Sequence, residues 1–291
     1  MSLASLIPLL IKLSIILSVF AIGLKASFRD ATYLFRRPSL LVRAWLSMGV
    51  VMPLFALIVA LNSDLNPPVR IALVALSVSP IPPILPRKAL KSGGEENYTI
   101  GLLVATAVFA IVLIPLMIEV FEVASGIAMR MRFGGVALIV LTTVLLPLVV
   151  GMSVRVLWPI FAERRAKLIA LVATVLLVLS CLPILFTSVR ALLTLIGDGT
   201  LFALAAFAIL GIIVGHLLGG PDPDNRAVLA LATSSRHPAV ALAIAHANFP
   251  GQKLAGAVIL IYLVLSAILA APYLNWATKK HKKLIKPAEA L

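Results

Sequence analysis

The stretch SSRHPAVALAIA, residues 234–245, decides how this chain folds. It lies inside an apolar segment, Ala227 to Ala247, that is long enough to cross a bilayer. Arg236 stands in the middle of this segment, where a charged side chain costs about 2.5–3.5 kcal/mol on insertion scales. Pro238 follows closely and breaks the same helix. A charge and a broken helix at one membrane depth indicate a solute site rather than a simple span.

The composition of the 291 residues is that of a polytopic membrane protein. Hydrophobic residues make up 62% of the chain, charged residues only 12%, and the mean hydropathy is +1.12. Apolar segments fill most of the length, so we expect no separate soluble domain. The single cysteine, Cys181, indicates neither a disulfide framework nor a metal cluster. The first residues lack a basic region and a clear cleavage site, which predicts a retained first span.

The fold class that we expect is all-α, with about nine membrane-spanning helices. The expected spans are residues 5–24, 39–62, 69–91, 97–120, 133–157, 166–188, 199–219, 226–248 and 252–277. This arrangement puts most of the 25 Lys and Arg residues on the side of the C-terminus. The positive-inside rule then places the C-terminus in the cytoplasm and the N-terminus outside, in a bacterial inner (plasma) membrane. The net charge of +14 is thus explained without a nucleic-acid partner.

Two expected spans are interrupted, and their positions predict an inverted repeat. Residues 69–91 contain the proline-rich run SPIPPILP, residues 79–86, and residues 226–248 contain Arg236. With nine spans these two segments run in opposite directions, which is the pattern of inverted-repeat carriers. The first half would be residues 1–124 with four spans, and the second half residues 125–291 with five.

The two interruptions predict a binding site where the broken helices cross. The first parts of the helices would end near Ser79 and near Ser235, leaving free carbonyls that favour a cation. The second parts would start near Pro82 and Pro238, since proline suits the first helical position, and Ser235 is the expected cap of the second. Helix starts favour an anion. The candidate site residues are Ser79, Pro82, Pro83, Ser234, Ser235, Arg236, His237 and Pro238.

Arg236 has no obvious acidic partner, because all 11 acidic residues are assignable to loops, tails or span ends. Three interpretations stay open. The guanidinium can bind the free carbonyls as a tethered cation in place of sodium. It can instead pair with an anionic substrate through its bidentate fork. It can also be a structural residue that ties the two broken helices together with no solute.

Three further polar residues are candidates for the site. His237 is a candidate proton-coupling group, so a proton is considered as a coupling ion; the alternative is a neutral hydrogen-bonding spacer. Asn97 and Thr99, at the inner start of the fourth span, can reach a cytoplasmic vestibule, or simply belong to a solvated helix start. No metal cofactor is expected.

Three stretches of the chain resemble the bile acid:sodium symporter family. They are GLKASFRDATYLFRRPSLLVRAW, residues 23–45, SPIPPILPRKALKSGG, residues 79–94, and SSRHPAVALAIA. The second and third occupy the places of the two broken helices of that family. The resemblance implies a panel domain and a core domain, alternating access, organic-anion substrates and two sodium ions.

The same resemblance puts sodium coupling in doubt. The Gln and Asn of the family's second crossing motif fall on Arg236 and His237, and its sodium-binding Glu falls on Ala232. The Asn of the first crossing motif falls near Pro86, whereas a Ser or Thr ligand corresponds to Thr99. Most sodium ligands are therefore absent.

We expect a secondary active transporter of a small organic anion in the lipid bilayer, with Arg236 binding the substrate or replacing sodium. The alternative is a non-transporting membrane receptor or lipid-binding protein on the same fold. The chain is not expected to be an enzyme, because it shows no Ser–His, two-carboxylate or metal constellation at helical spacing.

Overall fold

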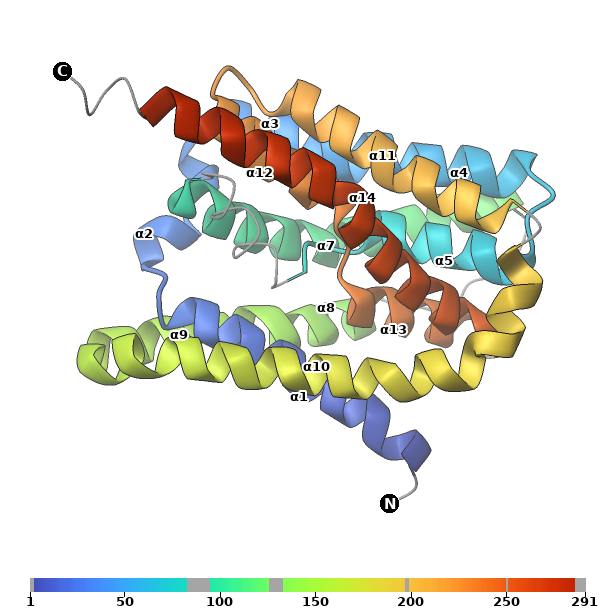
Figure 1. Cartoon of the computed structure of the whole chain (residues 1–291), viewed down its shortest axis with the longest axis horizontal. Helices are drawn as coiled ribbons and strands as arrows, with labels where there is room; N and C mark the ends of the chain where they lie inside the picture. The colour runs from blue at the N-terminus through green and yellow to red at the C-terminus, as the bar shows by residue number, and fades with distance from the viewer. Residues whose placement is uncertain (1–2, 83–94, 126–132, 197–198, 250, 286–291) are drawn as a thin grey trace.

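The structure is a computed structural model that describes residues 3–82, 95–125, 133–196, 199–249 and 251–285. All regular structure in these residues is helical (Figure 1), which confirms the all-α class. Among them, five helical stretches are long and apolar enough to cross a membrane. These stretches are Pro38–Asn62, Glu96–Ala124, Leu138–Leu157, Thr200–Leu218 and Leu254–His281.

The helices occupy the stretches that the hydropathy of the chain indicates. The N-terminal half contains α1 (Leu3–Gly23), α2 (Phe28–Ala31), η1 (Leu34–Arg36), α3 (Pro38–Trp45), η2 (Leu46–Val51), α4 (Met52–Asn62), α5 (Pro67–Val78) and α7 (Glu96–Ser125). The C-terminal half contains α8 (Phe133–Val140), η3 (Leu141–Leu145), α9 (Leu146–Leu157), α10 (Pro159–Ile196), α11 (Thr200–Leu218), α12 (Pro223–Ser234), α13 (Pro238–Asn248) and α14 (Lys253–Ile285). The later part of the expected span 69–91, from Pro83 onward, lies outside the described residues.

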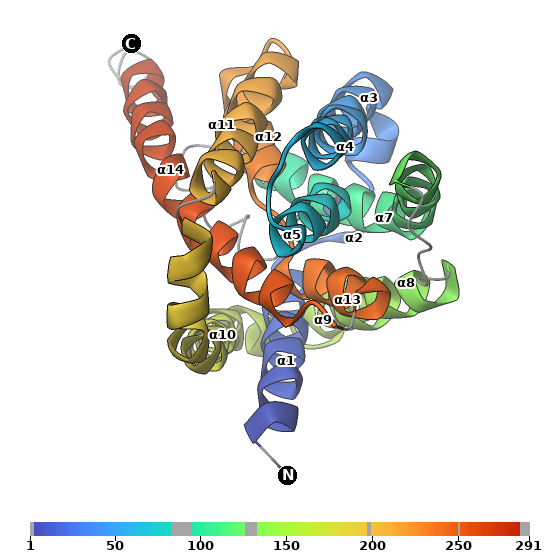
Figure 2. The ribbon, with the colours of Figure 1, turned by 90° about the vertical axis from the view of Figure 1, so that its right-hand side faces the viewer.

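The helices form two groups. Helix α1 packs against α9 and α10, and these three lie together on one side of the molecule in both views (Figures 1 and 2). Gly23 and Gly151 allow α1 and α9 to touch, because a Cβ on either would lie 2.5 Å from a carbonyl oxygen of the other helix. Helices α4, α5, α11, α12, α13 and α14 contact one another in the second group.

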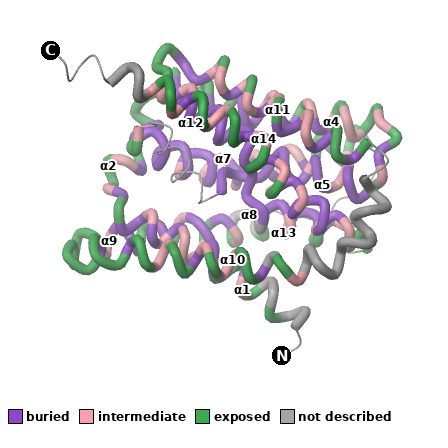
Figure 3. The backbone as a smooth tube through the Cα atoms, in the orientation of Figure 1, coloured by how far each residue is buried: buried purple, intermediate pink, exposed green. Residues whose placement is uncertain are grey.

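The second group buries the two interrupted helices. Residues Ala72 to Val78 of α5 are mostly buried, and every residue of α12 from Ala227 to Ser234 is buried. Figure 3 shows buried backbone concentrated in the middle of the bundle, whereas α9 and α10 present exposed residues outward. Many of these exposed residues are large and apolar, such as Leu171 and Val178, as expected for a surface that faces lipid.

Two π-helical turns each end two residues before a proline. The turn η2 precedes Pro53 and the turn η3 precedes Pro147. Proline has no N–H and its ring crowds the carbonyl four residues earlier, so a wider turn relieves the clash while the helix continues. The turn η2 also presents Ser47, whose hydroxyl lies 2.7 Å from that of Thr233 in α12, and both residues are buried.

A line of three glycines on α11 lets its backbone lie against α12. Gly211, Gly215 and Gly219 recur every fourth residue on one face. A Cβ on Gly215 would lie 2.5 Å from the Leu229 carbonyl oxygen and 2.6 Å from the Ala230 Cα. Helix association in lipid relies on such close backbone contact, since there is little hydrophobic drive to bring apolar helices together. The glycines therefore hold α12 against α11.

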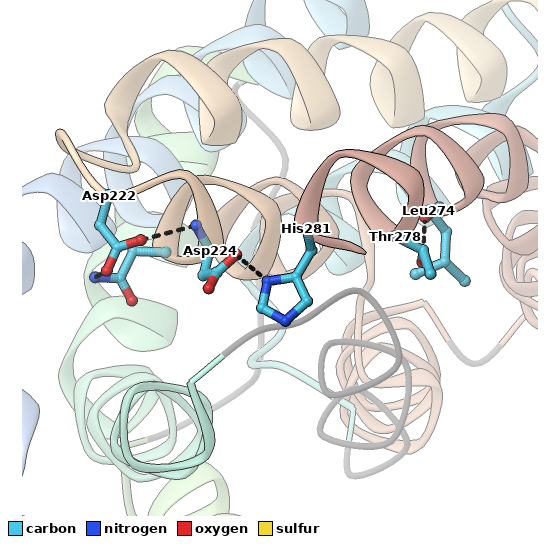
Figure 4. Close-up of polar contacts among 6 residues, drawn as sticks. Asp222, Asp224, Leu274, Thr278 and His281 are labelled. Atoms are coloured by element: carbon cyan, nitrogen blue, oxygen red, sulfur yellow. Dashed lines mark hydrogen bonds and ion pairs between the residues drawn. The ribbon is translucent and has the colours of Figure 1, made fainter. Parts of the chain in front are cut away.

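The start of α12 is held by polar contacts (Figure 4). The Asp222 carboxylate caps the helix by accepting a 2.9 Å hydrogen bond from the Asp224 backbone N–H. The Asp224 carboxylate in turn lies 3.0 Å from Nδ1 of His281, near the end of α14. The first turn of α12 is thereby tied to α14, and the last turn of α12 lies inside the bundle.

Substituting Gly215 by alanine should destabilise the protein, because the added methyl group meets the α12 backbone rather than a movable side chain. Overpacking of this kind typically costs about 1–3 kcal/mol. We expect a lower temperature of thermal unfolding in detergent for Gly215→Ala. Gly135 in α8 has nothing within 4 Å of the added Cβ, so Gly135→Ala should cause no loss. Equal behaviour of the two variants would contradict the close α11–α12 contact.

Candidate functional site

The two helix interruptions meet in the interior. After α5 ends at Val78, Ser79 is extended and the chain stays non-helical to Pro82. The His237 backbone N–H donates a 2.9 Å hydrogen bond to the Pro80 carbonyl. The Arg236 Nη1 donates a 3.2 Å hydrogen bond to the Ser79 carbonyl, 157 residues away in the chain. Two hydrogen bonds thus join the interruptions side by side.

The ends of the interrupted helices lie close to the predicted positions. Ser79 and Ser235 are the C-terminal caps of α5 and α12, and Pro238 is the first residue of α13. The predicted cap of α13 was wrong: the N-cap is His237, the residue directly before Pro238, whereas Ser235 lies two residues earlier and is the C-cap of α12. Pro82 lies in the non-helical segment and Pro83 lies outside the described residues.

Arg236 is buried with part of its guanidinium unused. The residue is 3% exposed, and its Cζ lies 5.9 Å from the ring centroid of Phe207. Nε and Nη2 have no hydrogen-bond partner among the described residues. These two nitrogens form one edge of the guanidinium plane, which matches two oxygens of a carboxylate or sulfonate. No Asp or Glu side chain is buried in the part of the chain that the structure describes.

His237 is fully buried beside Arg236. Its Nδ1 accepts a long hydrogen bond, 3.5 Å, from the Val240 backbone N–H, a role open only to a ring nitrogen without a proton. Its Nε2 has no partner among the described residues. The ring therefore caps α13 with one nitrogen and keeps the other available.

The cavity next to Arg236 is small and mostly apolar. Its volume is about 20 Å³, which is room for roughly one water molecule. Besides Arg236, its lining comes from η1, α3, η2, the end of α5 with the first interruption, and α7: Leu34, Ala44, Trp45, Met48, Gly49, Val78, Ser79, Pro80, Ala105, Thr106, Phe109, Ala110 and Leu113. An organic anion of several heavy atoms does not fit this cavity, so the structure shows the site closed.

Tyr262 of α14 satisfies the carbonyl at the end of α12. Its hydroxyl donates a 2.5 Å hydrogen bond to the Ser234 carbonyl. Its ring packs edge-on against the ring of Phe207, with 5.5 Å between the two ring centroids. In the same way, Arg236 donates a hydrogen bond to the Ser79 carbonyl. A side chain therefore satisfies a carbonyl at the C-terminal end of both α5 and α12. We did not identify Tyr262 from the sequence. Its signal is a phenol in the middle of an apolar span, which needs a hydrogen-bond partner when buried.

The hydroxyls of Ser79 and Ser234 point back onto their own helices. The Ser79 Oγ donates to the Ala75 carbonyl at 2.6 Å, and the Ser234 Oγ donates to the Leu231 carbonyl at 3.2 Å. These bonds satisfy donors that would otherwise be orphaned in an apolar interior. The open hydrogen-bonding capacity of the site consequently lies in the Arg236 guanidinium and the His237 ring.

Asn97 and Thr99 lie at the start of α7. Thr99 is buried, and its Oγ1 donates to the Glu95 carbonyl at 2.8 Å, whereas Asn97 is exposed. Within the described residues, no hydrogen bond links either of them to Arg236. Their proposed place at a cytoplasmic vestibule stays a prediction.

The loop before α3 is tied to the start of α7 by a tyrosine. The Tyr33 hydroxyl donates a 2.8 Å hydrogen bond to the Glu95 carboxylate, and Arg37 lies 4.3 Å from the Tyr33 ring centroid. Burial, with a further contribution from Glu95, raises the pKa of Tyr33 to about 12. The phenol therefore stays protonated at physiological pH and remains a donor.

Comparison with known proteins identifies the family. A sequence model described as the sodium bile acid symporter family matches residues 12–195. The match runs from α1 through most of α10 and includes the first interruption. It ends before Arg236 and the second interruption. A search of curated proteins found no match.

Removing the Tyr262 hydroxyl should destabilise the protein, because the Ser234 carbonyl would be left buried without a donor. Such a loss costs about 1–3 kcal/mol. We expect Tyr262→Phe to unfold at a lower temperature in detergent. The matched control is Tyr98→Phe: Tyr98 is equally buried, but its hydroxyl has no partner among the described residues. That change should be neutral or stabilising, and a loss as large as that of Tyr262→Phe would show that the phenol of Tyr262 has no special role.

Proposed function

The chain belongs to the sodium bile acid symporter family, and on that premise we propose that it is a secondary active transporter of a small organic anion. Arg236 is the residue proposed to hold the anion. The supporting observation is its unused Nε–Nη2 edge, buried at the meeting point of two helix interruptions. A planar, permanently charged donor pair at this depth fits a carboxylate or a sulfonate better than a neutral or cationic solute.

The same side chain is proposed to replace a coupling sodium ion. Its Nη1 already occupies the free carbonyl of Ser79, where a cation would bind. At the position that matches the family's sodium-binding Glu, this chain has Ala232, which is buried and carries no charge. One guanidinium can thus serve a carbonyl with one nitrogen and an anion with the other two. His237, with its open Nε2, is the residue proposed for any proton coupling.

Alternating access is proposed to involve the two helix groups. In this proposal, helices α1, α9 and α10, which pack on one another, act as one body, and the group containing both interruptions acts as the other. A shift of one body against the other would open the closed site to one side of the membrane and then to the other. We further propose nine spans in an inverted repeat, with the N-terminus outside and the C-terminus cytoplasmic. The opposite course of the two interrupted helices and the bias of Lys and Arg support this topology.

Replacing Arg236 with glutamine tests the proposed anion site. Hydrogen bonds to charged groups contribute about 1.5–3 kcal/mol, so we expect the affinity to fall by roughly 10- to 100-fold. Binding is measured by thermal shift with taurocholate, benzenesulfonate and phenylacetate, since an anion at 100 times its Kd adds about 2.7 kcal/mol of stability. Uptake of the radiolabelled anions into proteoliposomes measures transport.

The matched control is Arg70→Gln. Arg70 lies on α5, the first interrupted helix, and also reaches a backbone carbonyl, that of Ala60, but it is only half-buried. The Arg70→Gln protein should bind and take up the anions as the wild type does. Saturable binding without any uptake would instead favour a receptor or lipid-binding protein on the same fold. An Arg236→Gln protein that fails to fold while Arg70→Gln folds would favour a purely structural arginine.

Uptake should not require sodium, because Arg236 supplies the positive charge. The measurement compares taurocholate and benzenesulfonate uptake in sodium buffer and in potassium buffer at the same ionic strength. We expect equal initial rates. Strict dependence on sodium would contradict the replacement of sodium by Arg236 while leaving the anion site intact.

A further inference from the structure

The closed site carries one net positive charge when no anion is bound. Arg236 is permanently ionised, and its two described contacts, the Ser79 carbonyl and the Phe207 ring, are both neutral groups. The His237 ring adds no charge, because its Nδ1 accepts a hydrogen bond from Val240. No described Asp or Glu is buried to balance the guanidinium.

Water cannot screen this charge in the closed conformation. The cavity beside Arg236 holds roughly one water molecule, and Nε and Nη2 have essentially no exposed surface. A buried charge without a partner is strongly unfavourable, whereas a charge paired through good hydrogen bonds is tolerated. A monoanion on the Nε–Nη2 edge would both cancel the charge and satisfy the two donors. The closed state is therefore more accessible with an anion bound than empty.

We propose that this carrier is an anion exchanger, which returns across the membrane readily only when it carries a second organic anion. This inference rests on the proposed function and adds its mode of coupling. A carrier must pass through a closed state each time its site changes sides. The loaded site passes through it as a neutral pair, and the empty site as an unpaired cation. One monoanion therefore moves inward for each one that moves outward.

The same charge difference makes the two modes differ electrically. Exchange moves no net charge, because each crossing carries the neutral guanidinium–anion pair. Net uptake requires the empty, positively charged site to return outward, and an interior positive potential favours that step. A carrier that brought in a proton or a sodium ion with each monoanion would instead show net uptake insensitive to the potential.

The experiment measures radiolabelled benzenesulfonate and taurocholate uptake into proteoliposomes in sodium-free potassium buffer. The vesicles contain either the same unlabelled anion or a zwitterionic buffer with potassium chloride and no organic anion. We expect preloading to speed the initial uptake by roughly tenfold or more, since an unpaired buried charge raises the barrier for return. With valinomycin and a potassium gradient, an interior positive potential should speed uptake into unloaded vesicles and leave exchange unchanged.

The outcomes separate the exchange mode from the transport function. Uptake that is equally fast with and without preloading, or net uptake that ignores the potential, overturns exchange but leaves transport standing. Uptake absent in both kinds of vesicle, relative to protein-free vesicles, overturns both. Arg236→Lys, which keeps the charge, should keep the stimulation by preloading in whatever flux remains. In Arg236→Gln, the ratio of the uptake rate with preloading to the rate without it should fall toward one. In Arg70→Gln, this ratio should match that of the wild type.

Discussion

The structure depends on the direct joining of two helix interruptions. An interrupted helix leaves carbonyl and N–H groups without partners in an interior that offers almost no water. Here the two interruptions satisfy one another: the His237 N–H reaches the Pro80 carbonyl, and the Arg236 guanidinium reaches the Ser79 carbonyl. Tyr262 supplies the donor for the remaining carbonyl of Ser234. Without this mutual satisfaction the bundle would contain several orphaned polar groups at its centre.

The interruptions also explain why a cation is tolerated so deep in the bundle. Carbonyl groups at the ends of α5 and α12 carry partial negative charge, which stabilises a guanidinium next to them. The start of α13 favours an anion. Arg236 stands between these two influences and has one nitrogen engaged with the first and two nitrogens unused. The partial charges of the helix ends thus favour a cation with an anion beside it, and Arg236 is the cation.

Much of this arrangement is predictable from residue types alone. Long apolar runs specify where helices lie, and Pro238 specifies where one of them restarts, because proline cannot continue the preceding helix. The burial of Arg236 follows from its position within an apolar run that has no acidic residue. What local sequence cannot predict is which distant group meets which. The Ser79 carbonyl, the Tyr262 hydroxyl and the pairing of Ser47 with Thr233 are contacts between segments far apart in the chain. Ser235 was predicted as the cap of α13 because serine is a preferred capping residue, but the N-cap directly precedes the first helical residue, Pro238, and the residue there is His237.

The glycine line of α11 has a consequence for how the molecule can move. Because α11 and α12 touch backbone to backbone along Gly211 and Gly215, no slack exists for one to slide past the other. In the proposed transport cycle, a displacement that uncovered Arg236 would carry both helices together as one rigid unit. The boundary between moving and stationary parts in that cycle would consequently run beside this pair of helices and not through it.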